Sequence, residues 1–113
     1  MRCRFAIKPR ADDWLRGQGL EGLLRGIFFR NLLLVDAAKR LLNEVKDRRE
    51  VPASEWRELM GKYNLTVSNY ESAMQRLRAA GMLRKEKGVW ALSSDFAKYL
   101  TTAAQLWYDW KGS

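Results

Sequence analysis

The sequence predicts a mainly α-helical domain that carries one small β-hairpin, an α+β fold. Apolar residues recur at three- and four-residue steps between residues 34 and 80, which is the spacing of amphipathic helices. After Gly81 the pattern changes to the two-residue alternation of strands, and after residue 93 it returns to helical spacing. At 113 residues, the chain has the size of a single domain.

The charge balance favours a nucleic-acid partner. The chain has 21 Lys and Arg residues against 13 Asp and Glu residues, a net charge of +8 and a pI near 10.0. Residues 1–33 carry 7 basic and 3 acidic side chains, residues 34–92 carry 12 and 8, and residues 93–113 carry 2 and 2. The positive excess therefore lies upstream of a neutral C-terminal segment.

The residue types also limit the chemistry. The absence of histidine excludes a His-based triad, a His-ligated zinc site and an imidazole general base. We therefore expect no enzyme activity, no cofactor and no metal. Cys3 is the single cysteine, so no disulfide forms within the chain, and this fits a reducing, cytoplasmic compartment. Neither a signal peptide nor a membrane-spanning segment is expected.

Residues 1–33 are expected to form an N-terminal arm and a flanking helical segment. Residues 2–8 alternate in polarity, which suits a short strand or an extended arm. Residues 11–30 have helical apolar spacing but hold several glycines, so short or interrupted helices are predicted. The segment could complete a dimer interface or cover the first helix of its own chain.

A firm amphipathic helix is predicted from Asn31 onward. Its charged end, Lys46 to Glu50, is expected to be solvated. Val51 and Pro52 predict an extended link, after which Ser54 is expected to cap a second helix. The apolar stripe of the first helix consists of Leu34, Val35, Ala38, Leu41, Leu42 and Val45, and that of the second of Trp56, Leu59, Met60 and Tyr63.

A tight turn over Asn64 to Val67 leads to a third helix. Ser68 and Glu71 have the spacing of a capping box, so the helix is expected to start at Ser68. Gly81 is expected to end it. The buried stripe is predicted to consist of Tyr70, Ala73, Met74 and Leu77.

The hairpin and the last helix follow directly. Strands are predicted over Met82–Lys85 and Val89–Leu92, joined by residues 86–88. Ser93 or Ser94 is expected to cap the last helix. Its apolar stripe is predicted to consist of Phe96, Tyr99, Leu100, Ala103, Trp107 and Trp110.

Three helices followed by a two-stranded hairpin is the order of elements in a winged helix-turn-helix. Over residues 34–92 the chain resembles that superfamily, in particular its small MarR-like and archaeal regulators. The segment Leu77–Leu83 resembles the end of the recognition helix, where a buried leucine, a glycine and an apolar pair lead into the wing. Residues 1–33 would be the N-terminal flanking segment and residues 93–113 a C-terminal helix used for dimerisation.

The resemblance implies a sequence-specific regulator that binds double-stranded DNA. The third helix would enter the major groove and the hairpin would contact phosphates or the adjacent minor groove. The expected recognition-helix contacts are Ser68, Asn69, Ser72, Gln75 and Arg76, and the expected wing contacts are Arg84, Lys85 and Lys87. A homodimer is expected, with an interface of Phe96, Tyr99, Leu100, Ala103, Trp107 and Trp110.

Two other functions remain open at this point. A winged helix can serve as a protein–protein interaction module whose basic faces are only solvated. Charge alone can also support non-specific nucleic-acid binding. The DNA target, the regulated gene and any small-molecule effector cannot be read from the sequence.

Overall fold

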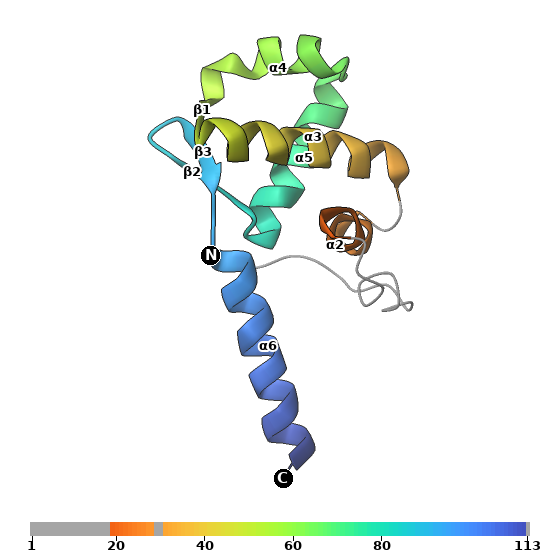
Figure 1. Cartoon of the computed structure of the whole chain (residues 1–113), viewed down its shortest axis with the longest axis vertical. Helices are drawn as coiled ribbons and strands as arrows, with labels where there is room; N and C mark the ends of the chain where they lie inside the picture. The colour runs from red at the N-terminus through yellow and green to blue at the C-terminus, as the bar shows by residue number, and fades with distance from the viewer. Residues whose placement is uncertain (1–18, 29–30, 113) are drawn as a thin grey trace.

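The computed structural model describes residues 19–28 and 31–112. It is mainly helical, with a small three-stranded antiparallel sheet, and so has the predicted α+β composition (Figure 1). The elements are α2 (Leu20–Ile27), α3 (Leu32–Arg48), β1 (Glu50–Pro52), the 3-10 helix η1 (Ala53–Glu55), α4 (Trp56–Tyr63), α5 (Val67–Ala80), β2 (Leu83–Glu86), β3 (Val89–Leu92) and α6 (Asp95–Gly112).

Helix α3, with 17 residues, lies at the centre of the core. Asn31 caps it, because its side chain accepts a hydrogen bond of 3.3 Å from the backbone N–H of Leu34. The predicted apolar stripe is confirmed, since each of its members is buried or half-buried. Residues 46–50 are exposed, as expected for a solvated helix end.

Helix α2 shows that part of residues 1–33 covers a helix of its own chain. It is an eight-residue helix that packs against α3 of its own chain, with Leu24, Ile27 and Phe28 in the shared core. The prediction of short helices in this glycine-containing segment is confirmed for the described part. The expected strand or arm over Met1–Arg10, including Cys3, lies outside the described residues.

Both predicted caps of α4 and α5 are wrong. Residues 53–55 form a 3-10 turn, so α4 begins at Trp56 and no side chain caps it, Ser54 included. Helix α5 begins at Val67 rather than Ser68, because the Thr66 hydroxyl accepts from the backbone N–H of Asn69 at 3.0 Å. Ser68 is already the second residue of the helix, so it cannot be the N-cap, and Thr66 holds that position.

The predicted tight turn between α4 and α5 contains a left-handed residue. Asn64 has φ 53° and ψ 50°, and the N–H of Leu65 donates to the carbonyl of Met60 at 2.9 Å. This closes α4 in the way that is typical of left-handed helix ends. Only residues 64–66 separate α4 from α5.

The sheet contains one more strand than predicted. The expected extended link at Val51 and Pro52 pairs with β3, which gives the strand order β1-β3-β2. The hairpin between β2 and β3 turns at Lys87 and Gly88, which both have positive φ, as a two-residue turn with the twist of the strands requires. Strand β2 therefore extends to Glu86, one residue beyond the predicted end.

Gly81 joins α5 to both the hairpin and α6. It ends α5 with φ 87°, and its carbonyl accepts from the backbone N–H of Phe96 at 2.9 Å. A Cβ at this position would lie 2.8 Å from that same nitrogen. Only glycine therefore permits both this backbone conformation and this close approach. Ser93 supports the start of α6 by accepting from the N–H of Asp95 at 3.1 Å.

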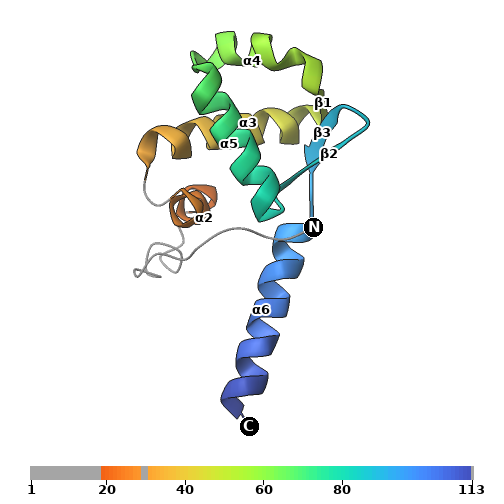
Figure 2. The ribbon, with the colours of Figure 1, turned by 180° about the vertical axis from the view of Figure 1, so that it is seen from behind.

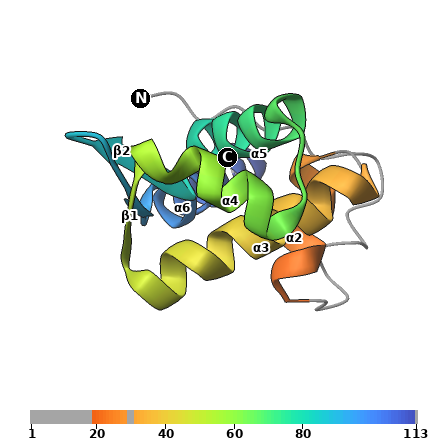
Figure 3. The same cartoon turned by 90° about the horizontal axis from the view of Figure 1, so that it is seen from above.

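The core lies where α2, α3, α5 and the sheet meet, and α6 leads away from it. Figures 1 and 2 show α6 projecting from the other elements, and its residues 101–112 are all exposed. Seen from above, α4 lies nearest the viewer, over α3 and α5, with the strands at one end of these helices (Figure 3). Among the described residues, none of the helices combines the length and apolar character that crossing a bilayer requires.

Candidate nucleic-acid interface

The outer face of α5 carries the polar side chains that the sequence singles out. Ser68, Ser72, Gln75 and Arg76 are exposed, and Asn69 is half-buried. The opposite face of α5 is held in the core by Tyr70, Ala73, Met74, Leu77 and Ala80, which are all buried. This burial fixes the orientation of the helix and so determines which side chains point outward.

The hairpin presents two different faces. Lys85 lies opposite Trp90 in the strand pairing, and its ammonium lies 5.4 Å from the centre of the Trp90 ring. Arg84 lies opposite Ala91, on the other face, where it lines a depression of about 280 Å³ with Lys87, Glu50 and Glu86. The side chains alternate along the strand, so Arg84 and Lys85 leave opposite faces of the hairpin, although both border a further depression beside Ser94 and Lys98.

Helix α5 and the hairpin border a common hollow of about 230 Å³. Gln75 from α5 and Lys85 from β2 both line it, so the structure brings one predicted recognition residue and one predicted wing residue together. The remaining lining residues are mostly apolar or aromatic, and they are Ala53, Trp56, Val67, Tyr70, Glu71, Met74 and Trp90. Burial raises the pKa of the Tyr70 phenol.

Arg76 has a structural contact that sequence reasoning missed. Its guanidinium donates a hydrogen bond of 3.1 Å to the carbonyl of Ile27, at the end of α2, and lies 5.8 Å from the centre of the Phe28 ring. A cation is favourable at a helix C-terminus, where the carbonyls lack partners within the helix. Arg76 thus ties α5 to α2, whereas the sequence pattern placed it among the residues that read DNA.

A polar cluster fixes α4 on α3. Glu44 of α3 is only 9% exposed and accepts hydrogen bonds from Lys62 at 2.8 Å and from the Tyr63 hydroxyl, both on α4. Arg48 contacts Glu44 at 3.4 Å and forms two hydrogen bonds with Glu55 at 2.9 and 3.0 Å. Charge-assisted pairs of this kind are the stronger class of hydrogen bond.

The pKa values of the cluster reflect these contacts. The hydrogen bonds from Lys62 and Tyr63 lower the pKa of Glu44 to about 2, against the opposing effect of burial. The Arg48 guanidinium lowers the pKa of Glu55, and Glu44 raises the pKa of Lys62. All three groups are charged near neutral pH, and Lys62 is engaged by Glu44 rather than presented to a ligand.

Several residues at this interface escaped sequence reasoning. Glu71, assigned to a capping box, lines the hollow instead. Arg57 on α4 is exposed beside it, with its guanidinium 4.8 Å from the centre of the Trp56 ring. Glu44 is buried on the same side of α3 as the apolar stripe. Its spacing of four residues from Arg48, which allows an ion pair along the helix, was the local feature that could have indicated its role.

The residues predicted for a dimer interface fall into two groups. Phe96 is buried in the core of its own chain, and Tyr99 and Leu100 are half-buried. Ala103, Trp107 and Trp110 are exposed. The first group anchors α6 to the body, and the second lies on the projecting half of the helix.

Within the described part of the chain, no group of three or more Cys, Asp or Glu side chains is placed to hold a metal ion.

Comparisons with known proteins add one finding. A family model described as "Archaeal family" matches residues 18–110. No curated protein and no solved structure matches the chain.

Proposed function

The chain belongs to this archaeal family, whose description names no activity, and we propose that it is a winged helix-turn-helix protein that binds double-stranded DNA. The observation that carries the proposal is the hollow shared by α5 and the hairpin, with Gln75 and Lys85 on its walls. The element order α3, β1, α4, α5, β2, β3 and the strand order β1-β3-β2 also support it. The three-residue turn from α4 to α5 has the length of a helix-turn-helix connection.

In this proposal α5 enters the major groove and presents its outer face to base edges. Gln75 and Asn69 can pair with adenine, and Ser68 and Ser72 can contact a base or a phosphate. Glu71, on the same wall as Gln75, can accept a hydrogen bond from the amino group of cytosine. The mixture of amide, hydroxyl and carboxylate groups suits selective rather than purely electrostatic binding.

The hairpin would hold the DNA backbone. Lys85 lines the hollow, whereas Lys87 lies at the hairpin turn and lines the depression that also holds Arg84. Both lysines are exposed and can neutralise phosphates. Arg84 faces away from the hollow, with Glu50 and Glu86 nearby, so we expect a smaller contribution from it. Because Arg76 holds the end of α2, its main role in this proposal is to position α5.

The test is fluorescence anisotropy of labelled duplex DNA over a salt series, with wild type and three variants. Replacing both Lys85 and Lys87 by alanine should weaken binding and reduce the salt slope by about 2, one for each lost phosphate contact. Lys39→Ala with Arg40→Ala removes the same charge from α3, outside the hollow, and serves as the matched control. Absence of binding at low salt would reject the proposal.

Gln75→Ala separates specific from non-specific binding. It removes no charge, so a specific interface loses discrimination of about 1–3 kcal/mol at one base position. A selection from random duplexes, followed by measurement on the selected site, makes the comparison. An unchanged affinity for every sequence would leave only non-specific nucleic-acid binding.

Transcriptional regulation in the cytoplasm, without enzyme activity, is the biological role we propose for such a protein. A second candidate is a winged-helix module that assembles with other proteins. The exposed aromatic residues on α6 favour it, because apolar patches of this kind mark interaction surfaces. Binding to a protein partner that is insensitive to salt, with no DNA binding, would support this second function.

A further inference from the structure

The projecting half of α6 exposes large apolar side chains at its end. Leu106 is 64% exposed, Trp107 is 56% exposed and Trp110 is 71% exposed. The two indole rings stack on one another, with centroids 5.4 Å apart and ring planes at 28°. Together these three side chains form one apolar surface, here called the α6 tip.

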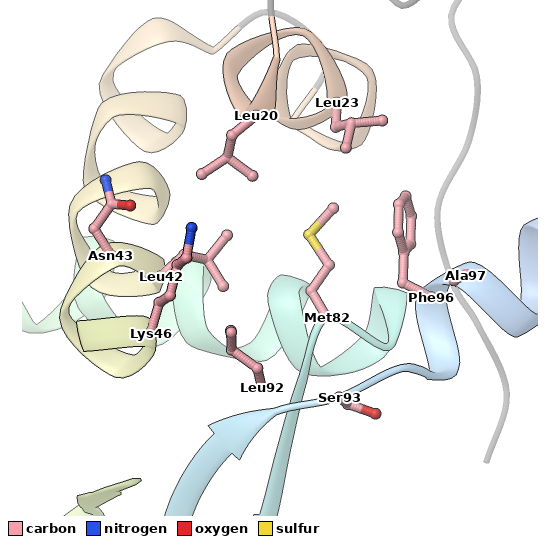
Figure 4. A pocket seen from close by; sticks show the side chains of 10 residues that line it. All are labelled: Leu20, Leu23, Leu42, Asn43, Lys46, Met82, Leu92, Ser93, Phe96 and Ala97. Atoms are coloured by element: carbon pink, nitrogen blue, oxygen red, sulfur yellow. The ribbon is translucent and has the colours of Figure 1, made fainter. Parts of the chain in front are cut away.

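An apolar groove lies at the other end of the same helix. It has a volume of about 400 Å³, within the range of about 300–1,000 Å³ that is typical of occupied pockets. Leu20 and Leu23 of α2, Leu42 of α3, Met82 and Phe96 form its apolar walls, as Figure 4 shows, and Lys46 stands at its rim. This opening is called the root groove below.

We propose that two copies of this chain pair through antiparallel α6 helices, with the α6 tip of each copy seated in the root groove of the other. Helix α6 has 18 residues, a length of about 27 Å at about 1.5 Å per residue. In an antiparallel pair centred on Ala103, residue 110 of one copy lies opposite residue 96 of the other. Phe96 is a wall of the root groove, so the tip of one helix reaches the groove of the other copy.

One two-fold operation then covers both surfaces. A parallel pair would place the tips against each other and leave both root grooves without an apolar occupant. The antiparallel pair also sets the helix dipoles in opposite directions, which is the favourable arrangement. An interface of this kind uses the same patch on both copies and closes at two subunits.

The area available fits a stable dimer. Side chains of this size bury about 150–250 Å² each, so the exposed part of the tip amounts to about 300–400 Å² per copy. The half-buried Tyr99 and Leu100 of the facing stripe and the lining of the groove add to this area, toward the roughly 800 Å² per partner of standard interfaces. The inference concerns assembly and stands whether or not the proposed DNA binding is correct.

The first test is the mass of the full chain in sedimentation velocity without DNA, over a range of protein concentrations. Replacing Trp107 and Trp110 by alanine removes the tip and should weaken dimerisation by about 30-fold or more. Leu23→Glu places a charge on the groove wall, far from the tip in sequence, and should weaken it to a similar degree. Leu33→Glu is the matched control, because Leu33 is exposed on α3 outside the groove, and it should leave the dimer intact.

The second test does not depend on the fold surviving a charged substitution. With Cys3 replaced by Ser, protein carrying Ala97→Cys is mixed with protein carrying Asp109→Cys and oxidised, since residue 109 lies opposite residue 97 in this register and both tryptophans stay in place. The antiparallel pair should give a disulfide between the two different proteins, because the two Cα atoms must approach within about 7 Å. Each test has its own contrary result. A monomer at every concentration would overturn the proposal, as would a dimer that Leu23→Glu leaves intact or disulfides only between like cysteines.

Discussion

Helices α5 and α6 both have an apolar stripe, yet they bury it very differently. In α5, five of 14 residues are buried, and Leu77 is completely inaccessible. In α6, only Phe96 of 18 residues is buried, and residues 101–112 are all exposed. An apolar stripe therefore identifies a face that needs a cover, but it does not say whether the same chain supplies that cover.

The two helices also differ in their polar contacts. Helix α5 receives the Thr66 cap at its start and is tied to α2 through Arg76. In the outer half of α6, Gln105 donates a local hydrogen bond of 2.8 Å to Asp109, one turn further along the same helix. Contacts between distant segments thus stabilise α5, whereas residues 101–112 of α6 are exposed throughout.

Leu77→Ala and Leu106→Ala test this contrast with the largest expected effect. Leu77→Ala leaves a cavity in the core and should lower the free energy of unfolding by about 2–5 kcal/mol. Leu106 is 64% exposed, so the same substitution there should change the stability of the monomer by less than about 0.5 kcal/mol. Urea denaturation at low protein concentration measures both. Equal losses would mean that α6 is packed against its own chain.

Local signals were sufficient for much of the fold. The helical stripe of α3, the left-handed residues Asn64 and Gly81, and the change of period at the hairpin each involve residues close together in sequence. Such patterns are visible in a single sequence because the interactions that produce them are local. The general α+β composition follows from them.

The rest depended on contacts between distant residues. Strand β1 has three residues and ends in Pro52, so only its pairing with β3, about 40 residues later, makes it a strand. Glu44 meets Lys62 and Tyr63, 18 and 19 residues away, and Arg76 meets Ile27 at a separation of 49. Of the predicted site, the structure places Gln75 and Lys85 at one hollow and Arg84 elsewhere.

Gly81→Ala tests the junction between the two helices. The substitution combines positive φ with a contact of 2.8 Å to the backbone of Phe96, so we expect a loss of about 2–3 kcal/mol in unfolding free energy. Gly61→Ala is the matched control, because a Cβ there meets no atom within 4 Å. It lies within α4 and should stabilise the protein by about 0.5–1 kcal/mol. If Gly81→Ala were as benign as its control, the junction would not be rigid.

Glu44→Gln tests how far the polar cluster supports the body that holds α5. The pKa of Glu44 is about 2 in the folded protein, lower than the roughly 4.3 of an unfolded chain. Its charge therefore stabilises the fold above about pH 5, and this contribution is lost as the pH falls toward 2.

At pH 7 we expect Glu44→Gln to reduce the unfolding free energy by about 1–2 kcal/mol, and the difference from wild type should vanish as the pH falls toward 2. Urea denaturation at a series of pH values measures it. Asp36→Asn is the control, because Asp36 pairs with Arg40 on an exposed surface and should cost only a few tenths of a kcal/mol. A difference that persists unchanged at the lowest pH would show that the charge of Glu44 is not the cause.

Arg76→Ala should have the smallest effect and separates positioning from DNA recognition. It removes the hydrogen bond to Ile27 and the contact with Phe28, so we expect a loss of about 1 kcal/mol and faster amide exchange in α2. Arg40→Ala removes an exposed arginine of α3 and should leave exchange in α2 unchanged. If Arg76→Ala weakens DNA binding without altering α2, then Arg76 contacts DNA directly. If both change together, the residue acts by holding α5 against α2.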